Sequence, residues 1–343
     1  MMTTSYISSI NFWNAPRTGL SRLQTDLAAT NSEIATGRYA DVGLVLGTKV
    51  GTGLGLRQQS AEIDALKSGN GVATLRLKTT QSALAQMQSA ADKLLASIVG
   101  QPEAQQTAVV ETGSNQLTPL VSALNMTMAG QYVFGGANSG AAPIDLAAID
   151  AMRQRLQTDF QDHFGYAPGS SAAATEDPAK VQAFLDTYVD GEFSDASWGG
   201  LSQASSAISS RIALNEEATT SASADARPFA QLTMAYVIAS DFKLSSFSPN
   251  AQKVANQKVM SLLAAASSGL VTMQADLGRS QDRIAQANDR LDAQKTLLSG
   301  EVNDLEAVDP AAAKTKVDAL TTQIQMSYAL TAQLRQLSLV NYL

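Results

Sequence analysis

Apolar residues recur along much of the chain with an average spacing of 3.5 positions, the period of a helix that packs in a coiled coil. One series runs from Ile63 to Ile98, and a second runs from Leu263 to Val308. The first comprises Ile63, Leu66, Asn70, Ala73, Leu77, Thr80, Leu84, Met87, Ala91, Leu94 and Ile98, and the second Leu263, Ala266, Leu270, Met273, Leu277, Ser280, Ile284, Ala287, Leu291, Gln294, Leu298, Glu301, Leu305 and Val308. The pattern predicts two long helices with matching apolar seams, one from each half of the chain.

Two shorter series predict two further helices. One comprises Val110, Gly113, Leu117, Leu120, Leu124 and Thr127, and the other, near the start of the sequence, comprises Trp13, Leu20, Leu23, Leu27 and Ile34. Gly37 is the expected stop of the first helix, and Gly100 with Pro102 ends the helix of the Ile63 series. Asp309 is a suitable N-cap and Pro310 a suitable first helical residue, so a new helix should begin there.

The heptad pattern is absent between residues 141 and 250. The segments "IDLAAIDAMRQRLQTDF" and "PAKVQAFLDTYV" predict short helices there, and "ARPFAQLTMAYVIASDF" predicts another. The segment "SSAISSRIALNEEATTSAS" alternates weakly and predicts a hairpin. This stretch is therefore expected to form a compact inserted α/β domain.

The predicted fold is mainly α: a long antiparallel coiled-coil bundle formed by both ends of the chain, with a smaller inserted α/β domain. Terminal helices are assigned to residues 1–40 and 309–343, a coiled-coil rod to 41–140 and 251–308, and the insert to 141–250. The glycine-rich stretch "DVGLVLGTKVGTGLGLRQQ" is expected to be a flexible linker. It lacks both the spacing of a dinucleotide fingerprint and the Lys-Ser/Thr of a P-loop.

The last predicted helix is apolar on two sides. Val317, Leu320, Ile324, Tyr328 and Leu334 fall on one stripe, whereas Met326, Leu330, Leu337 and Val340 fall roughly opposite. A helix that is apolar on both sides must be buried on both sides, and one neighbouring helix covers only one of them. The second surface is expected to come from another chain, the alternative being that this helix docks within its own domain. The candidate subunit-interface residues are Leu20, Leu23, Leu27, Ile34, Leu320, Ile324, Leu330, Leu334, Leu337, Leu339, Val340, Tyr342 and Leu343.

Composition restricts the chemistry that the chain can perform. The net charge is −7, which disfavours a dedicated nucleic-acid binder. Cysteine is absent, so disulfides and thiolate metal sites are excluded. The single histidine, His163, has Asp162 beside it but no nucleophile motif, and a structural role is favoured over that of a base. No catalytic, cofactor or metal-ligating residues are assigned, and the protein is not expected to be an enzyme.

Three segments resemble the bacterial flagellin superfamily. The segment "LQTDLAATNSEIATGRY" is similar to the first helix of that family and the turn that follows it. "GQYVFGGANSGAAPI" and the ending "LRQLSLVNYL" resemble the members that form the hook–filament junction. The glycine-rich stretch departs from the family, which usually carries a charged, Asp-containing segment after its first helix.

The resemblance implies a structural subunit whose terminal helices line an inner tube and whose insert faces outward. The implied partners are further copies in a ring, the first hook-associated protein, flagellin, and a cytoplasmic export chaperone on the C-terminal helix. No nucleic acid, membrane insertion or cofactor is expected. The start "MMTTSYISSINFWNAPR" does not resemble a cleavable signal peptide, and export through the flagellar type III channel to an extracellular flagellum is the implied route.

Two other functions stay open on the sequence alone. A filament flagellin would share the fold and the export route but would be present in thousands of copies. A surface enzyme on a coiled-coil stalk is the candidate from another class, and a turnover assay on the purified monomer would reveal it.

Overall fold

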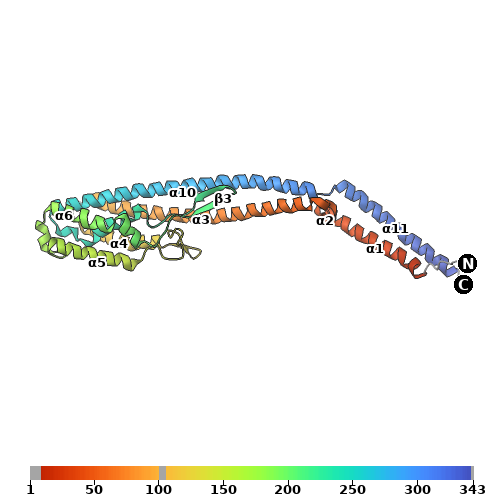
Figure 1. Ribbon diagram of the computed structural model, residues 1–343, viewed down its shortest axis with the longest axis horizontal. Coiled ribbons are helices and arrows are strands. Elements are labelled where there is room, and N and C mark those ends of the chain that lie inside the picture. Colours follow the sequence, from red (N-terminus) through yellow and green to blue (C-terminus); the bar gives the residue numbers. More distant parts are fainter. Residues whose placement is uncertain (1–8, 100–105, 341–343) are drawn as a thin grey trace. The chain divides into compact units, whose positions relative to one another are not determined.

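The computed structural model describes residues 9–99 and 106–340, and the side chains of residues 17–99 and 109–333. The described residues form two compact units, one within residues 1–64 and 292–343 and the other within residues 65–291. The protein is 78% helical, with long helices at both ends of the chain (Figure 1). This confirms the predicted mainly α fold with a small inserted sheet region.

The first unit contains both terminal helices. These are α1 (Ser9–Thr36) and α11 (Pro310–Val340), which lie side by side in Figure 1. Between α1 and the rest of the chain come α2 (Val42–Leu46) and the short 3₁₀ helix η1 (Gly47–Lys49). The unit also holds the beginning of α3 (Val50–Val99) and the end of α10 (Pro249–Glu306).

The glycine-rich stretch is helical, so the predicted flexible linker is wrong. Asp41 caps α2 by accepting a hydrogen bond from the Leu44 backbone N–H at 2.8 Å. Gly53 is buried, and a Cβ at this position would lie 3.8 Å from Leu46 Cδ1. Local capping and the packing of Leu46 over a small residue therefore offset the poor helix propensity of the glycines.

In the second unit, α3 and α10 pair as antiparallel helices. Hydrogen bonds join Asn70 to Asn288 at 2.7 Å and Gln81 to Gln281 at 3.2 Å, so later residues of α3 meet earlier residues of α10. The predicted seams are confirmed up to Leu291, since their members there are buried or half-buried. Beyond Leu291 the second seam is covered only in part, because Leu298, Leu305 and Val308 are half-buried whereas Gln294 and Glu301 are exposed. The predicted helix stop at Gly100 and Pro102 lies outside the described residues.

The helix α4 (Gln106–Leu124) packs on α9 (Arg227–Asp241), and the members of the third predicted seam from Val110 to Leu124 are buried or half-buried. Thr127, the last predicted member, lies beyond the helix and is exposed. A Cβ added at Gly113 would lie 2.8 Å from Ala239 Cβ and 3.3 Å from the Tyr236 carbonyl oxygen. These distances are shorter than side chains tolerate, so Gly113 permits the close approach of the two helices. After α4, β1 (Thr127–Met128) and β2 (Gln131–Tyr132) form a short antiparallel hairpin.

The predicted insert contains the helices and the hairpin expected from its sequence. Its elements are α5 (Leu146–Phe164), η3 (Ser171–Thr175), α6 (Pro178–Phe184), the π-turn η4 (Leu185–Val189), α7 (Asp190–Glu192), α8 (Asp195–Leu201), β3 (Ser209–Ala213), β4 (Glu216–Thr219), α9 and η5 (Leu244–Ser246). The strands β3 and β4 pair antiparallel with Ser209 opposite Thr219, and a bulge lies between Arg211 and Ala213. Arg283 and Arg290 of α10 bind Glu216, which fixes this hairpin to the long helix.

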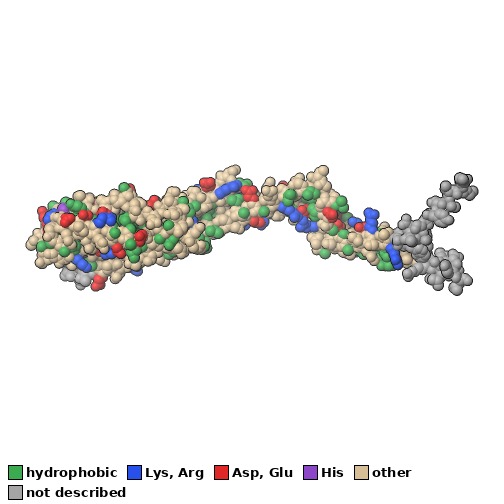
Figure 2. All heavy atoms as spheres, turned by 60° about the horizontal axis from the view of Figure 1, so that its bottom comes forward, with side chains coloured by type: hydrophobic (Ala, Val, Ile, Leu, Met, Phe, Trp, Pro, Cys, Tyr) green, Lys and Arg blue, Asp and Glu red, His purple; other side chains and the backbone are tan. Residues whose placement is uncertain are grey.

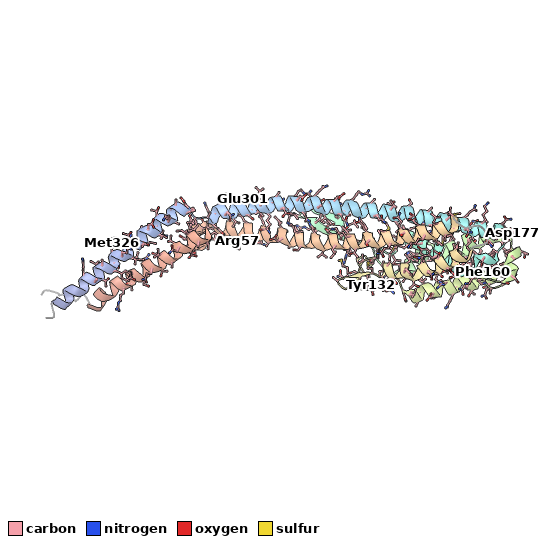
Figure 3. All side chains as sticks on the ribbon, turned by 180° about the vertical axis from the view of Figure 1, so that it is seen from behind. Arg57, Tyr132, Phe160, Asp177, Glu301 and Met326 are labelled. Atoms are coloured by element: carbon pink, nitrogen blue, oxygen red, sulfur yellow. The ribbon has the colours of Figure 1, made fainter. Side chains whose placement is uncertain are left out.

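One continuous core joins the insert to the long helices. Buried residues of α3, α4, α5, α9 and α10 belong to a single hydrophobic cluster. Phe160, labelled in Figure 3, stacks on Phe242 with 5.5 Å between ring centroids, and the Trp198 indole N–H donates to the Ala224 carbonyl at 3.0 Å. The boundaries proposed for the insert, 141–250, stay a prediction of the sequence.

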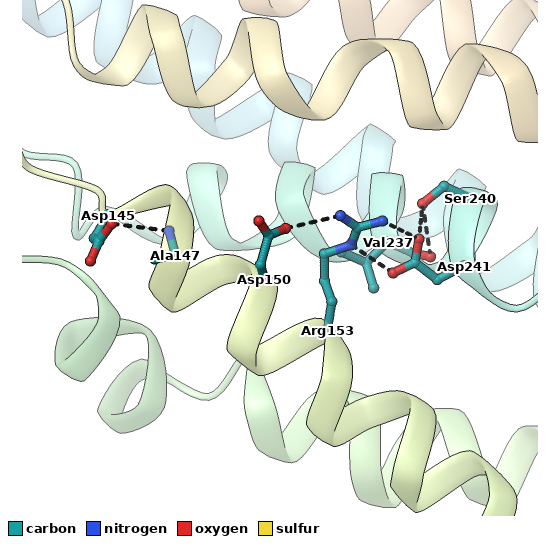
Figure 4. A network of polar contacts seen from close by, with 7 residues as sticks. All are labelled: Asp145, Ala147, Asp150, Arg153, Val237, Ser240 and Asp241. Atoms are coloured by element: carbon teal, nitrogen blue, oxygen red, sulfur yellow. Dashed lines mark hydrogen bonds and ion pairs between the residues drawn. The ribbon is translucent and has the colours of Figure 1, made fainter.

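A charged network ties α5 to α9 inside this unit (Figure 4). The Arg153 guanidinium donates two hydrogen bonds to the buried Asp241 carboxylate, at 2.7 and 2.8 Å, and a third to Asp150 at 3.1 Å. The bond to Asp241 raises the pKa of Arg153 despite its partial burial. Ser240 Oγ donates a hydrogen bond to the same carboxylate at 2.7 Å. Together these hydrogen bonds offset the cost of burying the carboxylate of Asp241.

Candidate assembly interface

The terminal helix pair is positioned by a junction at which α1 and α10 both end. Gly37 follows α1 with a φ of +70°, and its N–H donates to the Glu33 carbonyl at 2.8 Å, so the predicted stop is confirmed. The Tyr39 N–H then donates to the Glu306 carbonyl at 3.1 Å, and the Val308 N–H donates to the Gly37 carbonyl at 3.0 Å. These backbone bonds hold the end of α1 against the end of α10.

A buried carboxylate holds the same junction together. Glu306, the last residue of α10, is only 3% exposed, and its carboxylate binds the guanidinium groups of Arg38 and Arg57. Arg57, labelled on α3 in Figure 3, donates to the two carboxylate oxygens at 2.7 and 2.6 Å. One carboxylate therefore links the segment after α1, the start of α3 and the end of α10. We call Arg38, Arg57 and Glu306 the Glu306 clasp.

The start of α11 follows directly from this junction. Asp309 Oδ1 accepts a hydrogen bond from the Ala311 N–H at 2.9 Å, and Pro310 is the first helical residue. Both sequence predictions for this position are confirmed. Pro310 suits the first turn of a helix because it lacks the N–H that would have no partner there.

The two terminal helices pack along a narrow heptad seam. On α11 the covered positions follow steps of four and three and are Ala313, Val317, Leu320, Ile324, Ser327 and Thr331. On α1 the covered positions include Leu20, Leu23, Leu27 and Thr30. Gln24 Nε2 donates to the Tyr328 hydroxyl at 3.0 Å, which marks the register of the pair. Small and polar residues on this seam limit the apolar area that one helix buries on the other.

A second apolar surface of α11 stays exposed. Met326, labelled in Figure 3, is exposed, and so are Tyr328 and Leu330, the last with 59% of its surface accessible. Hydrophobic side chains are visible at the surface of the α1–α11 pair in Figure 2. The sequence pattern predicts Tyr328 on the same buried stripe as Leu320, and this prediction is wrong because Tyr328 is exposed. Its hydroxyl reaches Gln24 at the edge of the seam.

The connection after α1 exposes further apolar side chains that the sequence pattern did not single out. Leu44 is 81% exposed, and Val45, Val50 and Leu54 are also exposed. The sequence analysis predicts a flexible linker for the run "VGLVLG". Its uncharged apolar residues between glycines could have indicated the exposed apolar surface. Together with Met326, Tyr328 and Leu330, these residues form what we call the outer apolar set of the first unit.

The candidate interface residues divide into three groups. The first group lies in the seam between α1 and α11, is buried or half-buried, and comprises Leu20, Leu23, Leu27, Leu320 and Ile324. The second group is exposed and comprises Ile34 and Leu330. The third group has side chains outside the described part of the chain. It comprises Leu334, Leu337, Leu339 and Val340, which lie on α11, together with Tyr342 and Leu343. The side chain of Trp13 also lies outside that part.

The comparisons with known proteins match both ends of the chain. Residues 7–139 match the family model of the bacterial flagellin N-terminal helical region, and residues 256–343 match that of the bacterial flagellin C-terminal helical region. The chain belongs to the bacterial flagellin family. A search of curated proteins found no relative that matches this chain.

Flagellin family membership makes this chain a structural subunit of the bacterial flagellum that assembles with further copies. The matched ranges contain the whole Glu306 clasp and every residue of the outer apolar set. Neither range reaches α5, α6 or the β3–β4 hairpin. The junction and the terminal pair therefore belong to the part shared with other flagellins.

His163 lies among aromatic rings in the unmatched stretch. Its Nε2 is 3.3 Å from the Lys180 carbonyl oxygen, and its ring centroid is 4.8 Å from that of Phe164 and 5.4 Å from that of Tyr188. The His163 ring is therefore half-buried in aromatic packing. Among the described residues no group of three or more acidic or histidine side chains is arranged to hold a metal ion, and no helix is long and apolar enough to span a membrane.

Proposed function

We propose that this flagellin-family subunit forms the ring that joins the flagellar hook, with its first hook-associated protein, to the filament. It would thus be a junction subunit of the kind called the third hook-associated protein. The observation that carries the proposal is the ending "LRQLSLVNYL", whose Asn-Tyr-Leu resembles junction subunits more than filament flagellins. The segment "GQYVFGGANSGAAPI" supports the same assignment.

The outer apolar set and the end of α11 supply the proposed contacts between subunits. Leu330 and Met326 are exposed on α11, and Leu44 and Leu54 are exposed on the connection. A leucine or methionine side chain that becomes fully buried contributes about 1.5–3 kcal/mol. Several such contacts per subunit give strong cohesion, which a part that connects two mechanical elements needs. In this proposal Leu334, Leu337, Leu339, Val340, Tyr342 and Leu343 complete the contact.

The same surfaces explain the other partners that we propose. An apolar helix exported before assembly needs cover, and an export chaperone bound to α11 provides it inside the cell. After export, α11 becomes ordered together with the terminal helices of neighbouring subunits, because each helix buries the exposed surface of the other. In this proposal the ring contacts the first hook-associated protein on its hook side and flagellin on the opposite side.

A filament flagellin is the alternative, because the matched family models describe flagellins in general. The position of the protein on the flagellum separates the two functions. The chain contains no cysteine, so Thr187→Cys, at an exposed position of the insert, provides a single site for a maleimide dye. We expect one fluorescent spot per flagellum at the boundary between hook and filament. Labelling along the whole filament would establish the alternative and contradict the junction proposal.

Removal of residues 334–343 tests the role of the chain end. We expect the shortened subunit to keep its thermal transition, because the buried side chains of the described residues already form a core without these residues. Cells that make only this form should release flagellin into the medium and carry bare hooks. If such cells build attached filaments, these residues do not form the junction.

Substitutions within the described part of α11 provide a matched test. Met326→Ser with Leu330→Ser changes two exposed apolar residues, so it should leave the isolated subunit as stable as before while reducing filament attachment. Gln325→Ser, at an exposed polar position of the same helix, should leave attachment intact. A large drop in the melting temperature of the double variant would instead mean that these side chains are part of the subunit's own core.

A further inference from the structure

A pocket of about 590 Å³ lies in the second unit, between the long helix α10 and the β3–β4 hairpin with the segment that follows it. Figure 1 shows β3 beside α10. Leu277 of α10 and Ala222 after the hairpin are buried members of its lining, and Met273, also in the lining, is half-buried. The pocket therefore has an apolar base and is large enough for a small organic molecule.

The Ser280 hydroxyl is a polar group that the fold leaves open at this pocket. Ser280 lines the pocket and is only 8% exposed, and its hydroxyl has no hydrogen-bond partner among the described residues. The described side-chain atoms that are both inaccessible and unpartnered are Tyr236 Oη and Asn256 Oδ1, so the Ser280 hydroxyl is accessible. It can donate a hydrogen bond to a molecule in the pocket.

Arg283 places a fixed cation at the same pocket. It follows Ser280 by three residues on α10, so the two side chains share a face of the helix. Its Nη2 donates to the Glu217 carbonyl at 2.7 Å and its Nε to the Glu216 carboxylate at 3.4 Å, which ties the helix wall of the pocket to β4. Its side chain is nevertheless 50% exposed. Neither bond uses Nη1, so the two N–H groups of that nitrogen remain for a ligand.

The ion pairs around the pocket leave an excess of positive charge. Arg283 and Arg290 share the single carboxylate of Glu216, and Arg279, also in the lining, pairs with Asp276. Three guanidinium groups therefore meet two carboxylates in these pairs. The remaining positive charge favours an anion over a neutral molecule or a cation. A carboxylate suits the donors, since it accepts hydrogen bonds from a guanidinium and a hydroxyl together.

We propose that this pocket binds a small organic monoanion, a carboxylate on a compact apolar frame, with the carboxylate held by Arg283 and Ser280. The apolar frame lies against Leu277 and its apolar neighbours in the lining. Glu217 and Asp282 carry exposed carboxylates outside the lining, where water and salt screen their charge. The site is additional to the junction function, and its hairpin wall lies outside the ranges that match the flagellin models.

Three probes with the same ring frame test the proposal on the full-length subunit. Cyclohexanecarboxylate carries the anion, cyclohexanecarboxamide is its neutral isostere, and cyclohexylmethylammonium carries a positive charge. Binding is followed by the methyl resonance of Met273 in methionine-labelled protein, assigned with Met273→Leu. We expect saturable binding of the carboxylate, at least about tenfold tighter than that of the amide or the cation. The affinity for the carboxylate should fall as the salt concentration rises.

Variants of the pocket separate the anchoring groups. Ser280→Ala should weaken binding of the carboxylate about threefold or more and leave the melting temperature unchanged. Arg283→Gln should remove the preference for the carboxylate over the amide. Because that change also loosens the hairpin, Arg279→Gln, at an exposed residue, is a second test and should reduce the preference without a change in melting temperature. Arg155→Gln, at an exposed arginine bound to Glu192, is the control and should change neither affinity.

Two sets of results would contradict the proposal. If the carboxylate does not bind, or if the amide or the cation binds as tightly, the pocket does not select an anion. If both Ser280→Ala and Arg279→Gln bind the carboxylate like the wild type, or if Arg155→Gln weakens binding as much as they do, the named groups do not hold the ligand.

Discussion

At the scale of single residues, one carboxylate sets the geometry of the terminal unit. Glu306 ends α10 and binds two arginines from distant parts of the sequence, Arg38 and Arg57. A buried carboxylate without partners is strongly unfavourable, so the arrangement depends on both guanidinium groups. The backbone bonds of Gly37 and Tyr39 beside it then direct the chain from α1 into α2.

Glu306→Gln tests this dependence. The substitution preserves the shape of the side chain but removes the charge, so the three charge-assisted hydrogen bonds from Arg38 and Arg57 become weaker or are lost. We expect the first unit to lose about 1–3 kcal/mol of stability, measured by hydrogen exchange of the amides of α1 and α11. Glu301→Gln, at an exposed position of the same helix, is the control and should have little effect. Equal exchange in both variants would show that the clasp is not needed.

Leu291 tests the heptad register of the long helix. This residue is 2% exposed and is the last buried member of the predicted second seam. Leu291→Ala leaves a cavity and should cost about 2–5 kcal/mol, seen as a lower midpoint in urea unfolding. Lys295→Ala removes an exposed ion pair with Asp64 and should cost little. An unmoved midpoint for Leu291→Ala would mean that the seam is assigned to the wrong face.

At the scale of elements, the fold depends on close contacts between helices of unrelated sequence segments. The pairs α3–α10 and α1–α11 each join residues from opposite ends of the chain. The packing of α4 on α9 is also close, because Gly113 has no side chain at the contact with Ala239. The glycine is unfavourable for the isolated helix but necessary for the pair.

Gly113→Ala should therefore destabilise the protein even though alanine is the better helix former. We expect a loss of about 1–3 kcal/mol from overpacking, read from thermal or urea unfolding. Gly71→Ala on α3 is the matched control, since no atom lies within 4 Å of a Cβ at that position. This control should raise stability by about 0.5–1 kcal/mol. The opposite order of the two variants would contradict the close packing of α4 on α9.

At the scale of the whole molecule, the two units differ in how much apolar surface they bury. The large aromatic core and the buried leucines lie almost entirely within residues 65–291. The first unit has a narrow seam and an exposed outer apolar set. Its helices are therefore expected to open at lower free energy than the second unit while the subunit is a monomer.

Limited proteolysis of the monomer checks this difference. We expect early cleavage within residues 17–40 and 309–333 and a resistant fragment that contains residues 65–291. In the assembled flagellum the same sites should be protected, because neighbouring subunits cover them. Equal resistance of the terminal helices and the second unit in the monomer would show that α1 and α11 need no partner.

The sequence by itself determined the features that depend on residues close together along the chain. The 3.5-residue period located α3 and α10, and the stop at Gly37 and the start at Asp309 and Pro310 followed from capping chemistry. The composition of the insert was sufficient to predict its helices and its hairpin, because each depends on neighbouring residues. The matching seams of the two halves of the chain also predicted that helices from opposite ends pair.

Only the tertiary structure decided the features that join distant residues. The Glu306 clasp links residues that are 249 and 268 positions apart, and no local pattern marks such a pair. The glycine-rich connection became helical through the cap of Asp41 and the packing of Leu46, although its composition favoured a linker. The burial of the Tyr236 hydroxyl without a partner among the described residues likewise appears only in the packed chain, because burial and hydrogen-bond satisfaction depend on tertiary structure.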